Sequence, residues 1–282
     1  MNKAQWIIIG VGILLVAGLF RYGRKAVSLS EVKTPLQSAA QNDLTIDSIL
    51  FHAKEVLQPH QVKWMNDLEQ SVIRGDVKSQ KLNVYHQLAH FWKDSVGLFE
   101  PYVWYEAEAA RLENSEKSLT FAAHLLLEDL RNRDENERLK RWKALQAKDL
   151  FERSLKINDK NDSTIVGLGA AKIFGGIADN PMAEIGKVSQ LVKNDSTNVF
   201  ALTVLGDGAI MTGQYDVAIK RFGEVVALQP TNLKAILKIA EAYEKKADFA
   251  NAVKWYSNAL PLVAANPEIK TALENRIQQL KK

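Results

Sequence analysis

The chain has 282 residues, of which 46% are hydrophobic and 25% are charged, as expected for a folded protein with a substantial core. It contains no cysteine, which excludes disulfide frameworks, thiolate metal ligands and cysteine nucleophiles. The formal net charge is +4, and Lys3, Arg21, Arg24 and Lys25 account for it, because the other 33 Lys and Arg residues match the 33 acids. The rest of the chain is therefore neutral, which predicts no binding of nucleic acid.

The N-terminal region has the pattern of a membrane anchor. Residues 7–20 form an unbroken run of apolar residues and glycine, and the basic cluster Arg21, Arg24 and Lys25 follows directly. As a helix, residues 4–22 would extend about 28 Å, close to the ~30 Å thickness of the hydrocarbon core. The basic cluster stands where a secretory signal would carry its small-residue cleavage site.

We therefore expect an uncleaved anchor over residues 1–25, which crosses the membrane through residues 4–22, in preference to a secretory signal. The side of a membrane span with more Lys and Arg tends to stay in the cytoplasm. Arg21, Arg24 and Lys25 therefore favour a cytoplasmic location for the rest of the chain, in a single-pass protein of the inner or plasma membrane. An extracytoplasmic body is the alternative.

A polar linker over residues 26–45 leads into a helical body. Its composition is irregular and shows no sustained period. Beyond it, apolar residues recur at intervals of three and four without strand-like alternation, which predicts an all-α fold. The expected helices cover residues 47–57, 59–73, 79–92, 101–112, 115–131, 135–156, 163–174, 181–192, 198–212, 215–228, 233–246, 249–260 and 267–280.

The C-terminal half repeats itself at an offset of 34 residues. Seven residues are each followed 34 positions later by a residue of similar kind: Leu202, Leu205, Gly206, Ala209, Ala218, Phe222 and Val225 precede Ile236, Ile239, Ala240, Tyr243, Ala252, Tyr256 and Ala259. Small residues such as Gly206 and Ala240 allow two antiparallel helices to approach closely. Each hairpin leaves one apolar face uncovered, so successive hairpins must stack.

This pattern resembles the tetratricopeptide repeat family, as found in membrane-anchored bacterial proteins. The family's signature is matched by Leu202, Leu205, Gly206, Ala218, Phe222 and Pro230 in one unit and by Ile236, Ala240, Tyr243, Ala252, Tyr256 and Ala259 in the next. The resemblance implies a right-handed α-solenoid of antiparallel helix hairpins, which follows the transmembrane helix expected from the N-terminal apolar run. Its parts are a degenerate helical-repeat region over 46–160, tetratricopeptide-like repeats over 161–264 and a capping helix over 265–282.

The resemblance also implies a concave groove, lined by the first helix of each unit, that binds partner proteins or peptide segments. The inward positions are Phe200, Thr203, Asp207, Ile210, Lys234, Leu237, Glu241 and Glu244. The acids among them favour an amphipathic or partly basic segment of the partner. We therefore expect a scaffold or adaptor in the assembly or organisation of membrane-associated complexes, with no enzymatic activity and no cofactor.

Two alternatives remain open. The first is a metal-binding or enzymatic helical-repeat protein that uses His86 and His90, because histidines four residues apart share one face of a helix and can bind zinc. Gln87 stands where the zincin motif needs its glutamate, and no third ligand is evident, so we expect no metal site. The second is a structural membrane protein that associates with itself as a homo-oligomer.

Overall fold

The computed structural model describes residues 44–74, 77–132 and 136–281, which belong to one compact unit. These residues contain helices and no strand, which confirms the all-α prediction for this part of the chain. No helix in the described ranges has both the length and the hydropathy of a bilayer-spanning segment. The predicted anchor, residues 1–25, and all but the last two residues of the predicted linker, 26–45, lie outside the described residues.

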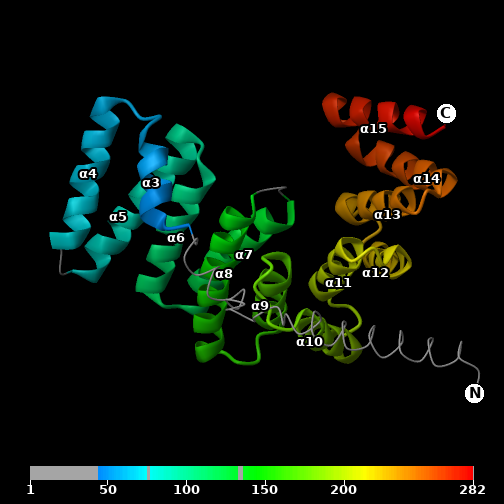
Figure 1. Cartoon of the computed structure of the whole chain (residues 1–282), viewed down its shortest axis with the longest axis horizontal. Coiled ribbons are helices and arrows are strands. Elements are labelled where there is room, and N and C mark those ends of the chain that lie inside the picture. The colour runs from blue at the N-terminus through cyan, green and yellow to red at the C-terminus, as the bar shows by residue number, and fades with distance from the viewer. Residues whose placement is uncertain (1–43, 75–76, 133–135, 282) are drawn as a thin grey trace, which may run out of the picture. The chain divides into compact units, whose positions relative to one another are not determined.

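The helices follow each other in chain order (Figure 1). Their bounds are α3, Ile46–Lys54; α4, Pro59–Arg74; α5, Lys78–His90; η1, Phe91–Val96; α6, Phe99–Glu113; α7, Glu116–Asn132; α8, Glu137–Ile157; α9, Asp162–Phe174; α10, Pro181–Asn194; α11, Val199–Met211; α12, Tyr215–Leu228; α13, Leu233–Lys245; α14, Phe249–Ala259; η2, Leu260–Val263; and α15, Pro267–Leu280. Asparagine caps the N-termini of α8, α9, α10, α11, α13 and α15, where its side-chain oxygen accepts a backbone N–H of the first turn.

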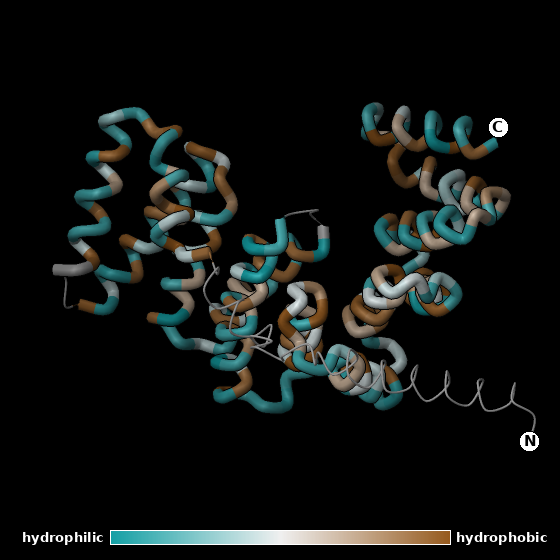
Figure 2. Tube along the Cα trace, viewed as in Figure 1, coloured by the Kyte–Doolittle hydropathy of each residue, from teal (hydrophilic) through white to brown (hydrophobic). Residues whose placement is uncertain are grey.

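Neighbouring helices pack as hairpins, as the repeat pattern predicts. Helix α11 packs on α12 and α13 packs on α14, while α12 and α13 join these two hairpins to each other. Upstream, α5 pairs with α6, α7 with α8 and α9 with α10. In amphipathic helices such as α13 the apolar residues lie on one face, which pairing buries, whereas α11 is apolar along most of its length (Figure 2).

The turn between the two helices of a hairpin is built in the same way in successive units. Gly213 has φ +71°, and the residue 34 positions later, Ala247, has φ +59°. After each of them a backbone N–H returns to the carbonyl five residues earlier, from Gln214 to Ala209 and from Asp248 to Tyr243. This is the left-handed helix ending that glycine favours, so Ala247 adopts a strained conformation that Gly213 adopts freely.

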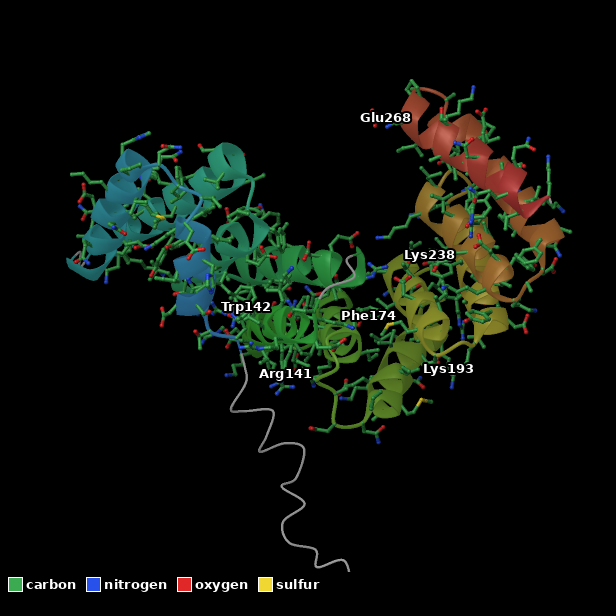
Figure 3. All side chains as sticks on the ribbon, turned by 45° about the horizontal axis from the view of Figure 1, so that its top comes forward. Arg141, Trp142, Phe174, Lys193, Lys238 and Glu268 are labelled. Carbon is green, nitrogen blue, oxygen red and sulfur yellow. The ribbon has the colours of Figure 1, made fainter. Side chains whose placement is uncertain are left out.

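A continuous core joins α6 to α13, and side chains such as Trp142 and Phe174 lie inside it (Figure 3). Helices of this core approach each other closely at Gly206, where a Cβ atom would lie 2.7 Å from the ring of Phe222, and more closely still at Gly167 and Gly175, which face Phe151 and Ala144. Smaller apolar clusters lie at each end, one from α3 to α6 and one from α13 to α15.

Several expected helices have other bounds in the structure: the helix predicted over 47–57 stops at Lys54, and two others pass into another kind of helical turn. The helix predicted over 79–92 stops at His90 and continues as the π-helical turn η1, which Gly97 ends with φ +76°. The helix predicted over 249–260 stops at Ala259 and tightens into the 3₁₀ turn η2. Pro261 lies in this turn, and proline lacks the N–H that an α-helix needs.

Candidate binding groove

A groove runs along helices α11 and α13 and is closed on one side by the end of α7. It consists of two adjoining cavities of about 400 and 190 Å³, which share Arg131, Asp207 and Lys238 in their linings. Arg131 belongs to α7, Asp207 to α11 and Lys238 to α13. The larger cavity reaches Asn232 at the start of α13, and the smaller one reaches Phe174 at the end of α9.

The structure places five of the eight predicted groove residues in this lining. Phe200, Thr203 and Lys234 line the larger cavity, Ile210 lines the smaller one, and Asp207 lines both. All five are partly buried, as expected of side chains that border a groove.

The other three predicted residues lie outside both linings. Leu237 packs with the apolar cluster of α13 to α15. Glu241 pairs with Lys238 of the same helix at 2.8 Å. Glu244 accepts hydrogen bonds from Tyr256 at 3.0 Å and from Arg276, and so connects α13 with α14 and α15.

The electrostatics of Glu244 agree with this structural role. The hydrogen bond from Arg276 lowers the pKa of Glu244 below its ordinary value. Burial, and then the nearby Glu244, raise the pKa of Tyr256 to about 12. Glu244 therefore stays ionised and Tyr256 stays a donor at neutral pH.

The principal interaction across the groove joins α7 to α11. Arg131 donates to the Asp207 carboxylate from Nε at 3.0 Å and from Nη2 at 2.5 Å, and the two side chains are only 6% and 12% exposed. Lys234 of α13 makes a second bridge to α7, through Glu128 at 2.6 Å. Arginine holds one carboxylate oxygen through two N–H groups here, which orients α7 and α11 relative to each other.

His124 lies where four helices meet beside the groove. Its ring packs edge to face against Phe151 of α8 and Phe200 of α11, with centroids 5.2 Å apart in both pairs. Nε2 lies 3.2 Å from the hydroxyl of Ser163 on α9. Burial, and secondarily the positive charge of Arg131, lower the pKa of His124 below its ordinary value, so the ring is neutral at pH 7.

Sequence reasoning missed the contribution of α7 and of two lysines to this site. Glu128 and Arg131 fall in the region that shows only a degenerate repeat, and Arg131 is 76 residues from its partner Asp207. No local pattern marks such a pair. Lys238 and Lys140 were missed because their neighbours in sequence suggest an ordinary solvated helix face.

The histidines of the alternative metal hypothesis have separate partners. His86 Nδ1 lies 3.8 Å from Glu106 on α6, whereas His90 Nδ1 lies 3.2 Å from Asp94 in η1. Across the residues that the structure describes, no three His, Cys, Asp or Glu side chains form a group that could hold a metal ion.

The chain was compared with known proteins. Residues 209–275, less than a quarter of the chain, match a family model described as "Tetratricopeptide repeat". This match supports the tetratricopeptide character of the hairpins from α12 to α14, where the 34-residue repeat is clearest. A search of curated proteins finds no match.

Three solved structures illustrate the similarity of the helical arrangement. MamA of Desulfovibrio magneticus RS-1 has 17% identity and a TM-score of 0.44, with 68% of this chain and 98% of that chain covered. YrrB, titled a TPR protein with an unusual peptide-binding site, has 15% identity and a TM-score of 0.41, with 74% of this chain and 97% of that chain covered. The APC/C hetero-tetramer Cut9-Hcn1 has 14% identity and a TM-score of 0.46, with 82% of this chain and 46% of that chain covered. Because all three TM-scores are below 0.5, we assign the fold from the chain's own hairpins and from the family match.

Proposed function

We propose that this chain is a scaffold that holds a polypeptide segment of a partner protein in the groove along α11 and α13. The observation that supports this function best is the pair of adjoining cavities, whose lining comes from α7, α8, α9, α11, α12 and α13 of a hairpin stack. A groove built from several stacked hairpins offers an extended surface, which suits a segment of chain better than a small molecule.

The lining indicates the chemistry of the partner. Arg131, Lys140, Lys234 and Lys238 supply four positive charges, against the two negative charges of Glu128 and Asp207. We therefore propose a segment in which carboxylates alternate with apolar side chains. This differs from the expectation of a partly basic segment, because the four bases of the lining outnumber its two acids, and Glu241 and Glu244 lie outside it.

The apolar part of such a segment has two contact points on α11. Phe200 and Ile210 border the two cavities and are partly buried. Apolar anchors set among charged residues are the usual composition of a specific protein-protein interface.

The test combines crosslinking with charge reversal. Crosslinking and mass spectrometry in native membranes identify the bound segment, and titration calorimetry with the synthetic segment measures its affinity. Lys234→Glu combined with Lys238→Glu should weaken binding at least about tenfold, since each reversal replaces an attraction by a repulsion. Lys220→Glu combined with Lys254→Glu changes the net charge equally at exposed sites on α12 and α14 and should leave the affinity within about twofold. Equal weakening by both pairs would contradict the groove assignment.

We also propose that residues 4–22 anchor the protein in the membrane, with the body in the cytoplasm, where the scaffold would organise membrane-associated complexes. The apolar run and the bases that follow it support this arrangement. Because the chain has no cysteine, Ser257→Cys would introduce a unique thiol at an exposed site. A membrane-impermeant maleimide should label it only after permeabilisation, and labelling of intact cells would contradict a cytoplasmic body.

A further inference from the structure

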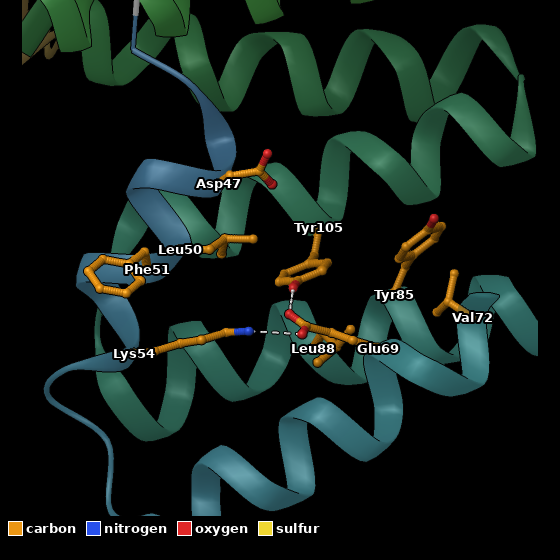
Figure 4. Close-up of a pocket in the computed structure, with 9 residues that line it drawn as sticks. All are labelled: Asp47, Leu50, Phe51, Lys54, Glu69, Val72, Tyr85, Leu88 and Tyr105. Atoms are coloured by element: carbon orange, nitrogen blue, oxygen red, sulfur yellow. Dashed lines mark hydrogen bonds and ion pairs between the residues drawn. The ribbon is translucent and has the colours of Figure 1, made fainter.

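A second cavity lies among α3, α4, α5 and α6, outside the groove and outside the family match (Figure 4). Its volume is about 450 Å³, enough for a long side chain of a partner, and each of the four helices contributes to its lining. The proposed scaffold function does not use this cavity.

The floor of the cavity is a preformed hydrogen-bonded network. Tyr105 donates its hydroxyl proton to one oxygen of Glu69 at 2.5 Å, and Lys54 pairs with the other oxygen at 2.9 Å. Tyr105 is 4% exposed, and burial together with the hydrogen bond to Glu69 raises the pKa of its hydroxyl. The tyrosine thus remains a donor, and both carboxylate oxygens of Glu69 have a partner, so the polar floor is stable without a ligand.

The mouth of the cavity is formed by one face of α3. Asp47 and Leu50 stand at positions i and i+3 and point toward Tyr105, whereas the ring of Phe51 points away from the cavity (Figure 4). The Phe51 side chain is 66% exposed. Among the residues that the structure describes, Asp47 forms no ion pair and no side-chain hydrogen bond. Its carboxylate can therefore accept two N–H hydrogen bonds from a bound cation.

The opposite wall adds a hydroxyl. Tyr85 lies across the cavity from α3 (Figure 4), and burial followed by the nearby charge of Glu108 raises the pKa of its hydroxyl. The lining has two acids, Asp47 and Glu69, against the single base Lys54. The cavity therefore attracts a cation with an apolar stem.

We propose that this cavity binds an arginine side chain of a partner polypeptide, with the guanidinium on the Asp47 carboxylate. A guanidinium can donate two parallel hydrogen bonds to one carboxylate, whereas a lysine ammonium is a strongly hydrated point charge. The methylene stem would lie against Leu50 and Val72, which line the same cavity.

The probe is a fluorescein-labelled peptide with one arginine between leucines, and two further versions have lysine or citrulline in its place. Fluorescence anisotropy with the full chain measures the three affinities. We expect arginine to bind at least about tenfold more tightly than citrulline, which keeps the shape without the charge, and severalfold more tightly than lysine. Equal affinities for arginine and citrulline, or for arginine and lysine, would overturn the assignment.

Variants at the mouth locate the site. Asp47→Asn should abolish the preference for arginine over citrulline, whereas Glu55→Gln, which removes an exposed carboxylate just beyond the end of the same helix, should preserve it. Leu50→Ala removes part of the apolar wall against which the methylene stem would lie and should weaken arginine binding severalfold, which tests the site independently of any effect of Asp47 on the first turn of α3. An unchanged preference in Asp47→Asn would refute the site. Lys234→Glu with Lys238→Glu should leave this binding intact, so failure of the groove proposal and failure of this one are distinguishable.

Discussion

Replacing Gly206 by alanine tests whether close packing within a hairpin specifies the fold. In a helix interior alanine is favoured over glycine by about 1 kcal/mol, so propensity alone predicts stabilisation. In the structure the new methyl group would lie 2.7 Å from the ring of Phe222, which is fully buried and cannot move aside freely. An extra methylene group in a packed core costs about 1–3 kcal/mol, so we expect Gly206→Ala to lower the free energy of unfolding by about 1 kcal/mol after the gain in propensity.

Gly208 on the same helix provides a matched control. A Cβ atom there would have no neighbour within 4 Å, and the residue borders a cavity of about 130 Å³. Gly208→Ala should therefore raise the free energy of unfolding by about 1 kcal/mol. Urea unfolding followed by circular dichroism measures both changes, and hydrogen exchange of α11 and α12 shows whether the loss is local, since stacked repeats can unfold in steps. Shifts of the same sign in both variants would refute the packing argument.

Three further predictions concern other sites. Ala247→Gly should raise the free energy of unfolding by up to about 1 kcal/mol in urea titrations, because glycine relieves the positive φ; a loss would show that the turn carries no strain. Lys143→Met should lower the free energy of unfolding by about 3–5 kcal/mol, because Lys143 is fully buried and its loss would leave the Asp129 carboxylate without this partner. An unchanged free energy of unfolding would show that this pair is dispensable. His124 has a lowered pKa in the folded state, so the unfolded state binds more protons as pH falls through about 6.5, and stability decreases there. His124→Gln should flatten this decrease in thermal melts at pH 5 to 8, and an unchanged slope would assign it to other groups.

Much of the helical fold could be predicted because its causes are local. The helix from 215 to 228 and the start of the helix at 181 were expected at the residues where the structure has them. Proline and asparagine mark the helix starts, and the 34-residue spacing of Gly206 and Ala240 marks the hairpins. These signals depend on neighbours within a turn or two of helix.

The groove could be predicted only in part. Phe200, Thr203 and Asp207 follow from their positions on the first helix of a repeat, and they do line the larger cavity. The placement of Glu241 and Glu244 could not be decided in the same way, because their partners come from the same helix face and from the terminal helix. Periodicity shows which side chains share a face but not what packs against that face.

The sequence by itself determined the helices, the hairpin repeat and the tetratricopeptide resemblance, because helix periodicity, capping and small-residue spacing act between residues close in the chain. Tertiary structure alone decided the charge of the groove and the existence of the cavity beneath α3. Arg131 reaches Asp207 from 76 residues away, and Tyr105 reaches Glu69 from 36 residues away. Pairs at such separations leave no trace in local composition, since any of several helices could have supplied the partner.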